Sequence, residues 1–252
     1  MAAGLRAVFE SADLIDLVIE VRDARMPRST AVAALHPKLR GKPTIVLLNR
    51  QDLADALLTA RWLAALAASG TGAFAGTGTR AATLKDLRTA LLAVRGRRGK
   101  VRAAVVGAPN TGKSSVINAL VRRRRAVAEN RAGVTRHIRW IGLDEKTDLL
   151  DTPGVLEPRI ASAAIAWQLG ACGVLPESAF DAESIAAHLA RWAASHHGEC
   201  AKIPSLESFA RRRGMLRRGG EPDWPNAARA YLAAFQAGSF GRITFELPGV
   251  GT

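Results

Sequence analysis

One segment, residues 107–114, constrains the fold of this chain most, because it satisfies the pattern G-x-x-x-x-G-K-[ST]. In such a loop the glycines let backbone N–H groups converge on phosphates, the lysine adds a charge and the hydroxyl ligates Mg²⁺. An apolar strand pattern over 101–106 precedes the segment, and a helical pattern over 114–121 follows it. The sequence therefore predicts a P-loop NTPase fold in which Lys113 meets the β- and γ-phosphates.

Strand and helix patterns alternate through the first 157 residues, which predicts an α/β domain with a mostly parallel sheet covered on both faces. The strands are expected at 17–21, 44–48, 73–74, 101–106, 138–143 and 147–150. Helices are expected at 52–69, 83–94 and 114–121. A Gly/Arg-rich linker near 95–100 joins the two halves of the predicted sheet.

From about residue 158 onward the sequence favours helices only. Asp181, Ser205 and Asn226 are candidate N-caps of three helices. The last helix would carry Tyr231, Leu232 and Phe235 on one face and end at Gly238. We therefore predict two domains, 1–157 and 158–252, of which the second is small and all-helical.

Magnesium ligands are expected on both sides of a candidate switch segment, residues 132–136. Asp151 begins a D-x-x-G turn after an apolar strand, where it can reach Mg²⁺ through water. The N–H of Gly154 can meet the γ-phosphate, and Thr135 can ligate Mg²⁺ while that phosphate is present. The predicted metal set is Ser114, Thr135 and Asp151, and the predicted catalytic set is Lys113, Thr135 and Gly154.

A reader of the nucleotide base is expected before the phosphate loop rather than after it. No N-K-x-D pattern follows Gly154, but Asn49-Arg50-Gln51-Asp52 stands at the end of a predicted strand. A carboxylate at Asp52 can accept both donors of the guanine edge, which adenine does not offer. An Asx-type helix cap at Asp52 is the alternative interpretation.

This motif order resembles the circularly permuted GTPases, in particular the subfamily that assembles the large ribosomal subunit in bacteria and mitochondria. The resemblance covers nearly the whole chain and implies a GTP-hydrolysing α/β domain followed by a helical domain that docks on ribosomal RNA. It also implies Mg²⁺, and a K⁺ ion held by Asn110 beside the phosphates. The matching segments are 23–27, 49–52, 107–115, 133–136, 151–154 and 238–246.

On this resemblance the base-supporting loop falls at Thr77-Gly78, where the match is loose. The expected nucleotide-binding residues are Asn49, Arg50, Asp52, Thr77, Gly78, Pro109, Asn110, Thr111, Gly112, Lys113, Ser114, Ser115 and Gly154.

Two departures from the family pattern bear on chemistry. Arg50 stands where Lys is usual, and it can still lie flat against the base. Val155 stands where many GTPases place a water-orienting Gln, and the histidine that replaces it in the family belongs to a segment before the first strand that this sequence does not show. Either the sequence starts late or another group, such as His137, orients the water. A GTP-binding module without hydrolysis and a P-loop small-molecule kinase remain as alternatives.

The charge of the chain indicates a polyanionic partner. Thirty-six Lys and Arg against 22 Asp and Glu leave a net charge of +14, with arginine runs at 95–100, 122–125 and 211–218. Basic surfaces bind RNA through counterion release, although solvated surface arginine is an alternative. Aromatic residues make up 5% of the chain and do not interleave with these runs, which favours contacts to the phosphate backbone or to folded RNA.

Cellular context follows from what the sequence does not show. Cys172 and Cys200 form no C-x-x-C pair, which is typical of idle thiols in a reducing compartment. No apolar run suits a membrane span, and no secretory signal is visible. We expect a monomer off the ribosome that works in the bacterial cytoplasm, with the mitochondrial matrix as the alternative. Its turnover should be slow alone and stimulated by the ribosomal particle.

Overall fold

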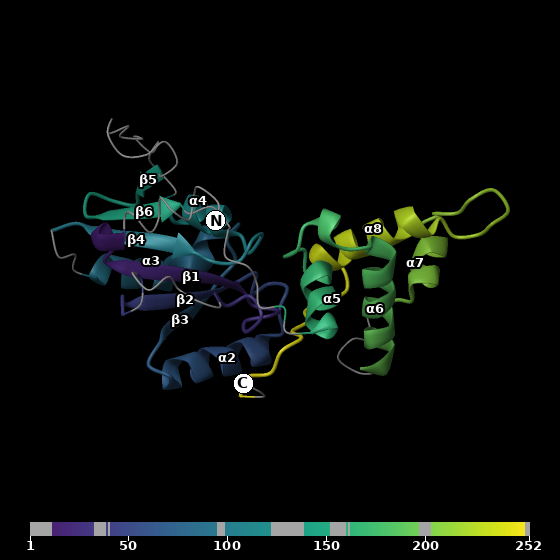
Figure 1. The fold of residues 1–252 in the computed structure, drawn as a ribbon, viewed down its shortest axis with the longest axis horizontal. Coiled ribbons are helices and arrows are strands. Elements are labelled where there is room, and N and C mark those ends of the chain that lie inside the picture. Colours follow the sequence, from purple (N-terminus) through teal and green to yellow (C-terminus); the bar gives the residue numbers. More distant parts are fainter. Residues whose placement is uncertain are drawn as a thin grey trace.

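The computed structural model describes residues 12–32, 39, 41–94, 99–121, 139–151, 160, 162–196 and 203–249. Within these residues, one sheet of six strands is followed by a group of helices (Figure 1). The strand order is β3-β2-β1-β4-β6-β5, and every neighbouring pair is parallel except β5 and β6. The strands are β1 (Leu17–Asp23), β2 (Thr44–Asn49), β3 (Gly72–Ala75), β4 (Val101–Val106), β5 (Arg139–Gly142) and β6 (Thr147–Asp151).

Helices cover both faces of this sheet, as expected for strands that are apolar on both sides. One face packs against α3 (Lys85–Ala93) and α4 (Lys113–Leu120). The other packs against α2 (Ala56–Ala68) and the short helix η1 (Ala12–Leu14). A further short helix, η3 (Ala81–Leu84), leads into α3. The predicted mostly parallel sheet and its two helical layers are confirmed.

The strand order reverses between β1 and β4, because β2 and β3 continue on one side and β6 and β5 on the other. In open α/β sheets, ligands bind at the carboxyl ends of the strands on either side of such a reversal. The segments that leave these two ends are the Asp23–Met26 loop after β1 and the P-loop after β4. The topology therefore brings the Asp23–Met26 loop and the P-loop together at the carboxyl ends of the strands.

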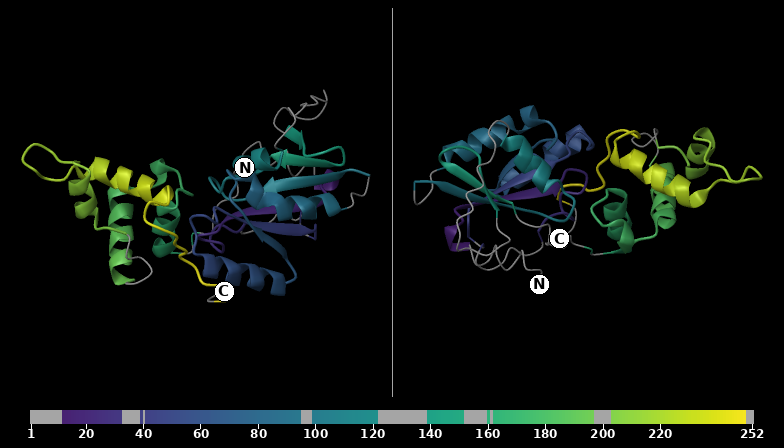
Figure 2. Two further views of the ribbon diagram at one scale, coloured as in Figure 1. Left: turned by 180° about the vertical axis from the view of Figure 1, so that it is seen from behind. Right: turned by 90° about the horizontal axis from the view of Figure 1, so that it is seen from above.

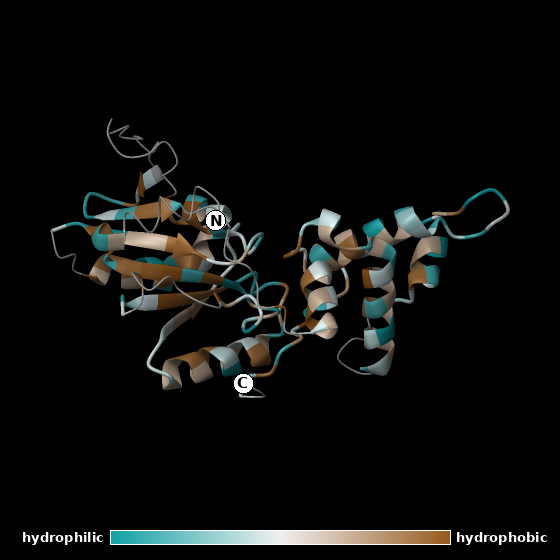
Figure 3. Cartoon of the chain, in the orientation of Figure 1, coloured by the Kyte–Doolittle hydropathy of each residue, from teal (hydrophilic) through white to brown (hydrophobic). Residues whose placement is uncertain are grey.

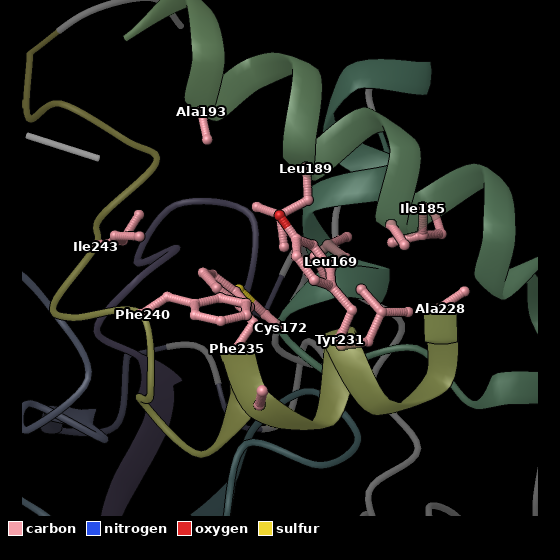
Figure 4. Packing of buried hydrophobic residues seen from close by; sticks show 14 of the residues in the cluster. Leu169, Cys172, Ile185, Leu189, Ala193, Ala228, Tyr231, Phe235, Phe240 and Ile243 are labelled. Carbon is pink, nitrogen blue, oxygen red and sulfur yellow. The ribbon is translucent and has the colours of Figure 1, made fainter. Parts of the chain in front are cut away.

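The helical part contains α5 (Ala163–Ala171), η4 (Glu177–Ala179), α6 (Ala182–Ser195), α7 (Leu206–Arg212) and α8 (Trp224–Gln236). Figure 2 shows it lying beside the sheet half. Its core gathers Leu169, Leu189, Tyr231 and Phe235 with Phe240 and Ile243 of the C-terminal tail (Figure 4). The buried face predicted for the last helix is confirmed.

Two predicted helix starts are wrong. The helix expected from residue 52 begins at Ala56, because Asp55 accepts from the N–H of Leu58 and caps it. Asp52 lies outside it, so the Asx-cap interpretation of Asp52 is also wrong. The last helix begins at Trp224 after Asp223, and Asn226 instead donates to the Asp223 carboxylate over 2.7 Å. The caps expected at Asp181 and Ser205 are confirmed by their bonds to backbone N–H groups.

The C-terminal tail leaves α8 and returns to the sheet half, where it runs toward α2 (Figure 1). The N–H of Ile243 donates to the Leu53 carbonyl, and that of Phe245 donates to the Arg25 carbonyl, each over 2.9 Å. Glu246 is 9% exposed and accepts from Arg28 N, Ser29 N and Ser29 Oγ. The tail therefore ties the two parts of the chain together.

Several predicted features lie outside the described residues: the linker core 95–98, the arginine run 122–125, and Thr135, His137, Gly154, Val155 and Cys200. Cys172 is buried, and burial raises the pKa of its thiol to about 12, as suits an inert cysteine. In the part of the chain that the structure describes, no helix is long and apolar enough to cross a membrane.

Candidate nucleotide site

The P-loop turns tightly between β4 and α4, and it needs glycine where its backbone passes other segments closely. Gly112 has φ +90°, a conformation that disfavours a side chain, and a Cβ there would collide with Nδ2 of Asn49. A Cβ on Gly107 would collide with the Val21 carbonyl oxygen of β1. The loop is braced internally by Thr111 Oγ1, which donates to the Ala108 carbonyl over 2.9 Å. These contacts hold the loop against the end of β1 and against the base motif.

Lys113 is 6% exposed and folds back over its own loop. Its Nζ donates to the carbonyl oxygens of Gly107 and Ala108 over 3.1 and 2.8 Å. Burial lowers the pKa of Lys113 to about 8, an effect that the charge of Asp151 partly opposes. Phosphate oxygens that replaced these carbonyls as acceptors would place negative charge beside the ammonium and raise its pKa again.

The two predicted magnesium ligands of this region lie side by side. Ser114 at the start of α4 and Asp151 at the end of β6 approach within 3.5 Å, Oγ to Oδ2. Hard oxygen donors at this edge suit Mg²⁺, which takes one or two protein oxygens and completes its shell with water and phosphate. Among the described residues, no group of three His, Cys, Asp or Glu could hold a metal alone. The oxygen donors of Ser114 and Asp151 fit a magnesium ion whose remaining ligands are phosphate and water oxygens.

The predicted base reader is held in place by the loop after β3. Asp52 Oδ1 accepts from Oγ1 of Thr77 over 3.0 Å, and its other oxygen lies 3.9 Å from Nη2 of Arg80. Thr77 is itself fixed, because its N–H donates to Oγ1 of Thr83 over 2.8 Å. The carboxylate of Asp52 is part-buried and oriented, as recognition of a base edge requires.

Asn49 joins the base motif to both neighbouring loops. Its Nδ2 donates to the Thr111 carbonyl over 2.7 Å, and its Oδ1 accepts from the Gly78 N–H over 2.8 Å. The side chain is 2% exposed, so both bonds are shielded from water. The structure therefore brings Asn49, Thr77, Gly78, Thr111 and Gly112 together.

Arg50 adopts φ +61° and extends its guanidinium between three acceptors. Nη2 donates to the Asn110 carbonyl of the P-loop over 2.8 Å. Nη1 donates to the Cys172 carbonyl at the end of α5 over 3.1 Å and lies 3.3 Å from Oδ2 of Asp23. From the sequence alone we expected Arg50 to lie against the base, and nothing in the motif indicated the contact with α5.

Asp23, which contacts Arg50, also forms a buried ion pair with Arg25. Arg25 and Asp23 are 1% and 0% exposed, and two hydrogen bonds of 2.9 and 2.7 Å join them. Burial by itself would raise the pKa of Asp23, but the guanidinium of Arg25 holds it below the usual value. Arg25 Nη2 also donates to the Cys172 carbonyl over 2.8 Å. Sequence reasoning assigned no role to this pair, although both residues belong to a segment matched to the family.

Of the remaining predicted residues, Pro109 and Asn110 lie in the P-loop and Ser115 lies in α4. Pro109 is half-buried, while Asn110 and Ser115 are exposed. Asn110 has φ +55°, and its Nδ2 lies 3.5 Å from the Val174 carbonyl just after α5.

Comparison with known proteins agrees with this geometry. Residues 102–180 match the family model described as "50S ribosome-binding GTPase". The chain is 31% identical to ribosome biogenesis GTPase A of Bacillus cereus, over 98% of this chain and 92% of that protein. It is 34% identical to the Thermotoga maritima protein of the same name, over 93% and 87%. The chain belongs to the ribosome biogenesis GTPase A family. The crystal structure of GNP-bound YlqF from T. maritima matches with a TM-score of 0.76 and 31% identity, over 97% of this chain and 98% of that one.

Family membership settles the class of the protein and of its reaction. The chain is a circularly permuted P-loop GTPase, as the order of its motifs predicts. Its helical C-terminal region follows the GTPase fold in the same way as in YlqF, because the match spans nearly both whole chains. The comparisons therefore support a protein that hydrolyses GTP, rather than a small-molecule kinase or a GTP-binding module without hydrolysis.

Proposed function

We propose that this GTPase assembles the large ribosomal subunit by binding its ribosomal RNA in the GTP state and leaving after hydrolysis. Asp52 would read the guanine edge, supported by Thr77. Lys113 would neutralise the β- and γ-phosphates, and Ser114 with Asp151 would hold Mg²⁺. Bound Mg²⁺ would supply Lewis-acid stabilisation of phosphate charge.

Loop closure is the second part of the proposal. Thr135 and Gly154 would order around the γ-phosphate and release when it is lost. A K⁺ ion on the Asn110 oxygen would add positive charge beside the phosphates, much as an arginine finger does. His137 is our candidate for orienting the attacking water. Turnover would be slow until the ribosomal particle completes the site.

The observation that carries the RNA proposal is a basic hairpin at the far end of the helical part. Residues 215–217 pair with 221–223, and Leu216 bridges Pro222. The arginine run 211–218 covers the last two residues of α7 and the first part of the hydrophilic loop between α7 and α8 (Figure 3).

Charge along the arginine run 211–218 is only partly compensated. Arg211 and Arg217 pair with Glu207 and Asp223. Arg212, Arg213 and Arg218 have no acidic partner among the residues that the structure describes. Uncompensated guanidinium groups on an exposed loop suit phosphate contacts.

This proposal divides the chain into a GTPase domain, 1–157, and a helical RNA-binding domain, 158–252, whose tail returns to the first domain. We place the protein in the bacterial cytoplasm as a monomer off the ribosome, with the mitochondrial matrix as the alternative.

The test measures binding of the GTP-analogue complex to purified large and small subunits over a range of salt. The variant R212Q/R218Q changes one arginine at the end of α7 and one in the hairpin. It is compared with R61Q/R88Q, which removes the same charge from exposed positions of α2 and α3. We expect selective binding to large subunits and a salt slope smaller by about 2 in R212Q/R218Q alone. Salt-insensitive binding, or equal losses in both variants, would contradict the RNA contact.

A further inference from the structure

The carboxyl end of α5 lies against three residues of the nucleotide site. The Cys172 carbonyl accepts from Arg25 and Arg50, and the Val174 carbonyl faces the Asn110 amide. The last carbonyls of a helix lack intrahelical partners and carry the negative end of its dipole. Two guanidinium groups therefore satisfy and neutralise the end of a helix that belongs to the other part of the chain.

Arg50 is the member of this group that reaches both parts at once. One terminal nitrogen donates to the P-loop at Asn110 and the other to α5 at Cys172. A planar guanidinium offers two separate –NH₂ groups, whereas the single ammonium of Lys is a compact point charge. Arg in place of Lys at this position of the base motif thus allows one side chain to bond the P-loop and α5 at the same time.

Movement at the end of α5 would shift α6 and α8 of the helical part, because both helices pack against it. Gln236 of α8 donates to the Ala171 carbonyl over 3.1 Å, and Leu169 and Cys172 belong to the core shared by α5, α6 and α8 (Figure 4). A pocket of about 230 Å³ adjoins this end, and Asn110, Gly173 and Gln236 are among the residues that line it.

We propose that Arg50 is a positioning residue that couples occupancy of the guanine site to the orientation of α5, and through α5 to the RNA-binding part. A bound nucleotide restrains the base motif, which carries Arg50, and the P-loop, which carries its acceptor Asn110. The guanidinium is then fixed in position, and its Nη1 holds the Cys172 carbonyl. By linkage, a partner that shifts the helical part changes nucleotide affinity by the same factor. This proposal rests on the GTP cycle proposed above.

Hydrogen exchange measured by mass spectrometry on the full chain, with and without saturating GDP, tests the coupling. The amides of Cys172, Gly173 and Val174 donate within the end of α5, so their exchange reports opening there. The variant is R50K, which keeps the charge and removes the second –NH₂ group. Its control is R80K, because the Arg80 guanidinium pairs with Asp52 of the same base motif rather than with α5.

In the wild type and R80K, GDP should slow exchange at 172–174 by about tenfold, the effect of one charge-assisted hydrogen bond. In R50K, GDP should still protect the P-loop, 107–114, while protection at 172–174 falls several-fold. Equal protection of α5 in R50K and wild type, equal loss in R80K, or no α5 protection in the wild type would overturn the coupling. A wild-type P-loop that GDP does not protect would instead refute nucleotide binding, and the coupling with it.

Discussion

The side-chain amide of Asn49 and the backbone carbonyl of Thr111 are joined by a 2.7 Å hydrogen bond, although 62 positions separate them in the chain. With the second bond, from Gly78 N–H to Asn49 Oδ1, this contact joins the base motif, the base-supporting loop and the P-loop. The two halves of a nucleotide site that the permuted sequence separates are thereby locked into one unit.

Replacing Asn49 by Ala should uncouple that unit. Two buried groups, the Thr111 carbonyl and the Gly78 N–H, would lose their partner at about 1–3 kcal/mol each. We therefore expect GDP binding to weaken at least tenfold and the free energy of unfolding to fall, measured by calorimetry and urea denaturation. The control is Asn226→Ala, an exposed asparagine whose side chain donates to Asp223. Similar losses in the control would argue against the bracing role.

A methyl group at Gly112 should abolish nucleotide binding. Gly112→Ala adds a strained left-handed backbone, about 1–2 kcal/mol, and a collision with Asn49. Gly41→Ala separates the two effects, because Gly41 has φ +78° but a methyl group there would meet no atom within 4 Å. Fluorescent GDP binding should vanish in the first variant and persist in the second. Binding in both would show that the close approach to Asn49 is dispensable.

Nucleotide affinity should fall as pH rises above about 8. The free Lys113 ammonium begins to lose its proton there, whereas bound phosphates raise its pKa and draw the proton back. GDP binding at pH 8.5 should therefore take up protons, and affinity should drop by up to tenfold per pH unit. Calorimetry in two buffers of different ionisation enthalpy measures this uptake. Binding without proton exchange would contradict the position of Lys113.

The same group should affect the stability of the free protein in the opposite direction. Its folded pKa lies below its usual value of 10.5, so folding disfavours its charged form. The resulting destabilisation is present below pH 8 and is relieved as the pH rises from about 8 toward 10.5.

Removing the Glu246 carboxylate should release the tail from the sheet half. Glu246→Ala leaves the N–H groups of Arg28 and Ser29 without their charged acceptor and should cost about 3 kcal/mol of unfolding free energy. Glu207→Ala is the matched control, because Glu207 pairs with Arg211 on an exposed helix face. Urea denaturation that finds the two variants equally stable would contradict the role of the tail.

The local parts of this structure are the parts that sequence patterns predict. Strand β4, the P-loop and α4 can be predicted because they form one contiguous motif. Asp52 can be predicted as a candidate base reader because it stands just beyond the buried strand β2. The start of α8 is misplaced by the attractive cap at Asn226, although Pro225 just inside the helix is the better signal.

Features that depend on distant contacts are not predictable in this way. Helix α5 is not among the helices predicted from the sequence, because its alanine-rich sequence is apolar on nearly every side and shows little periodicity. The bond from Arg25 to Cys172 spans 147 positions, and that from Arg28 to Glu246 spans 218. Such pairs become visible only when the fold brings the segments together.

The proposed ribosome-stimulated GTPase cycle is tested most directly by phosphate release from GTP in K⁺ or Na⁺, with and without large ribosomal subunits. Lys113→Ala is compared with Lys146→Ala, which removes the same charge from an exposed position. We predict slow release alone, stimulation by large subunits in K⁺, loss of turnover in Lys113→Ala and normal turnover in Lys146→Ala. Tight GTP binding without release in every condition would contradict this cycle and point to a module that binds GTP without hydrolysing it.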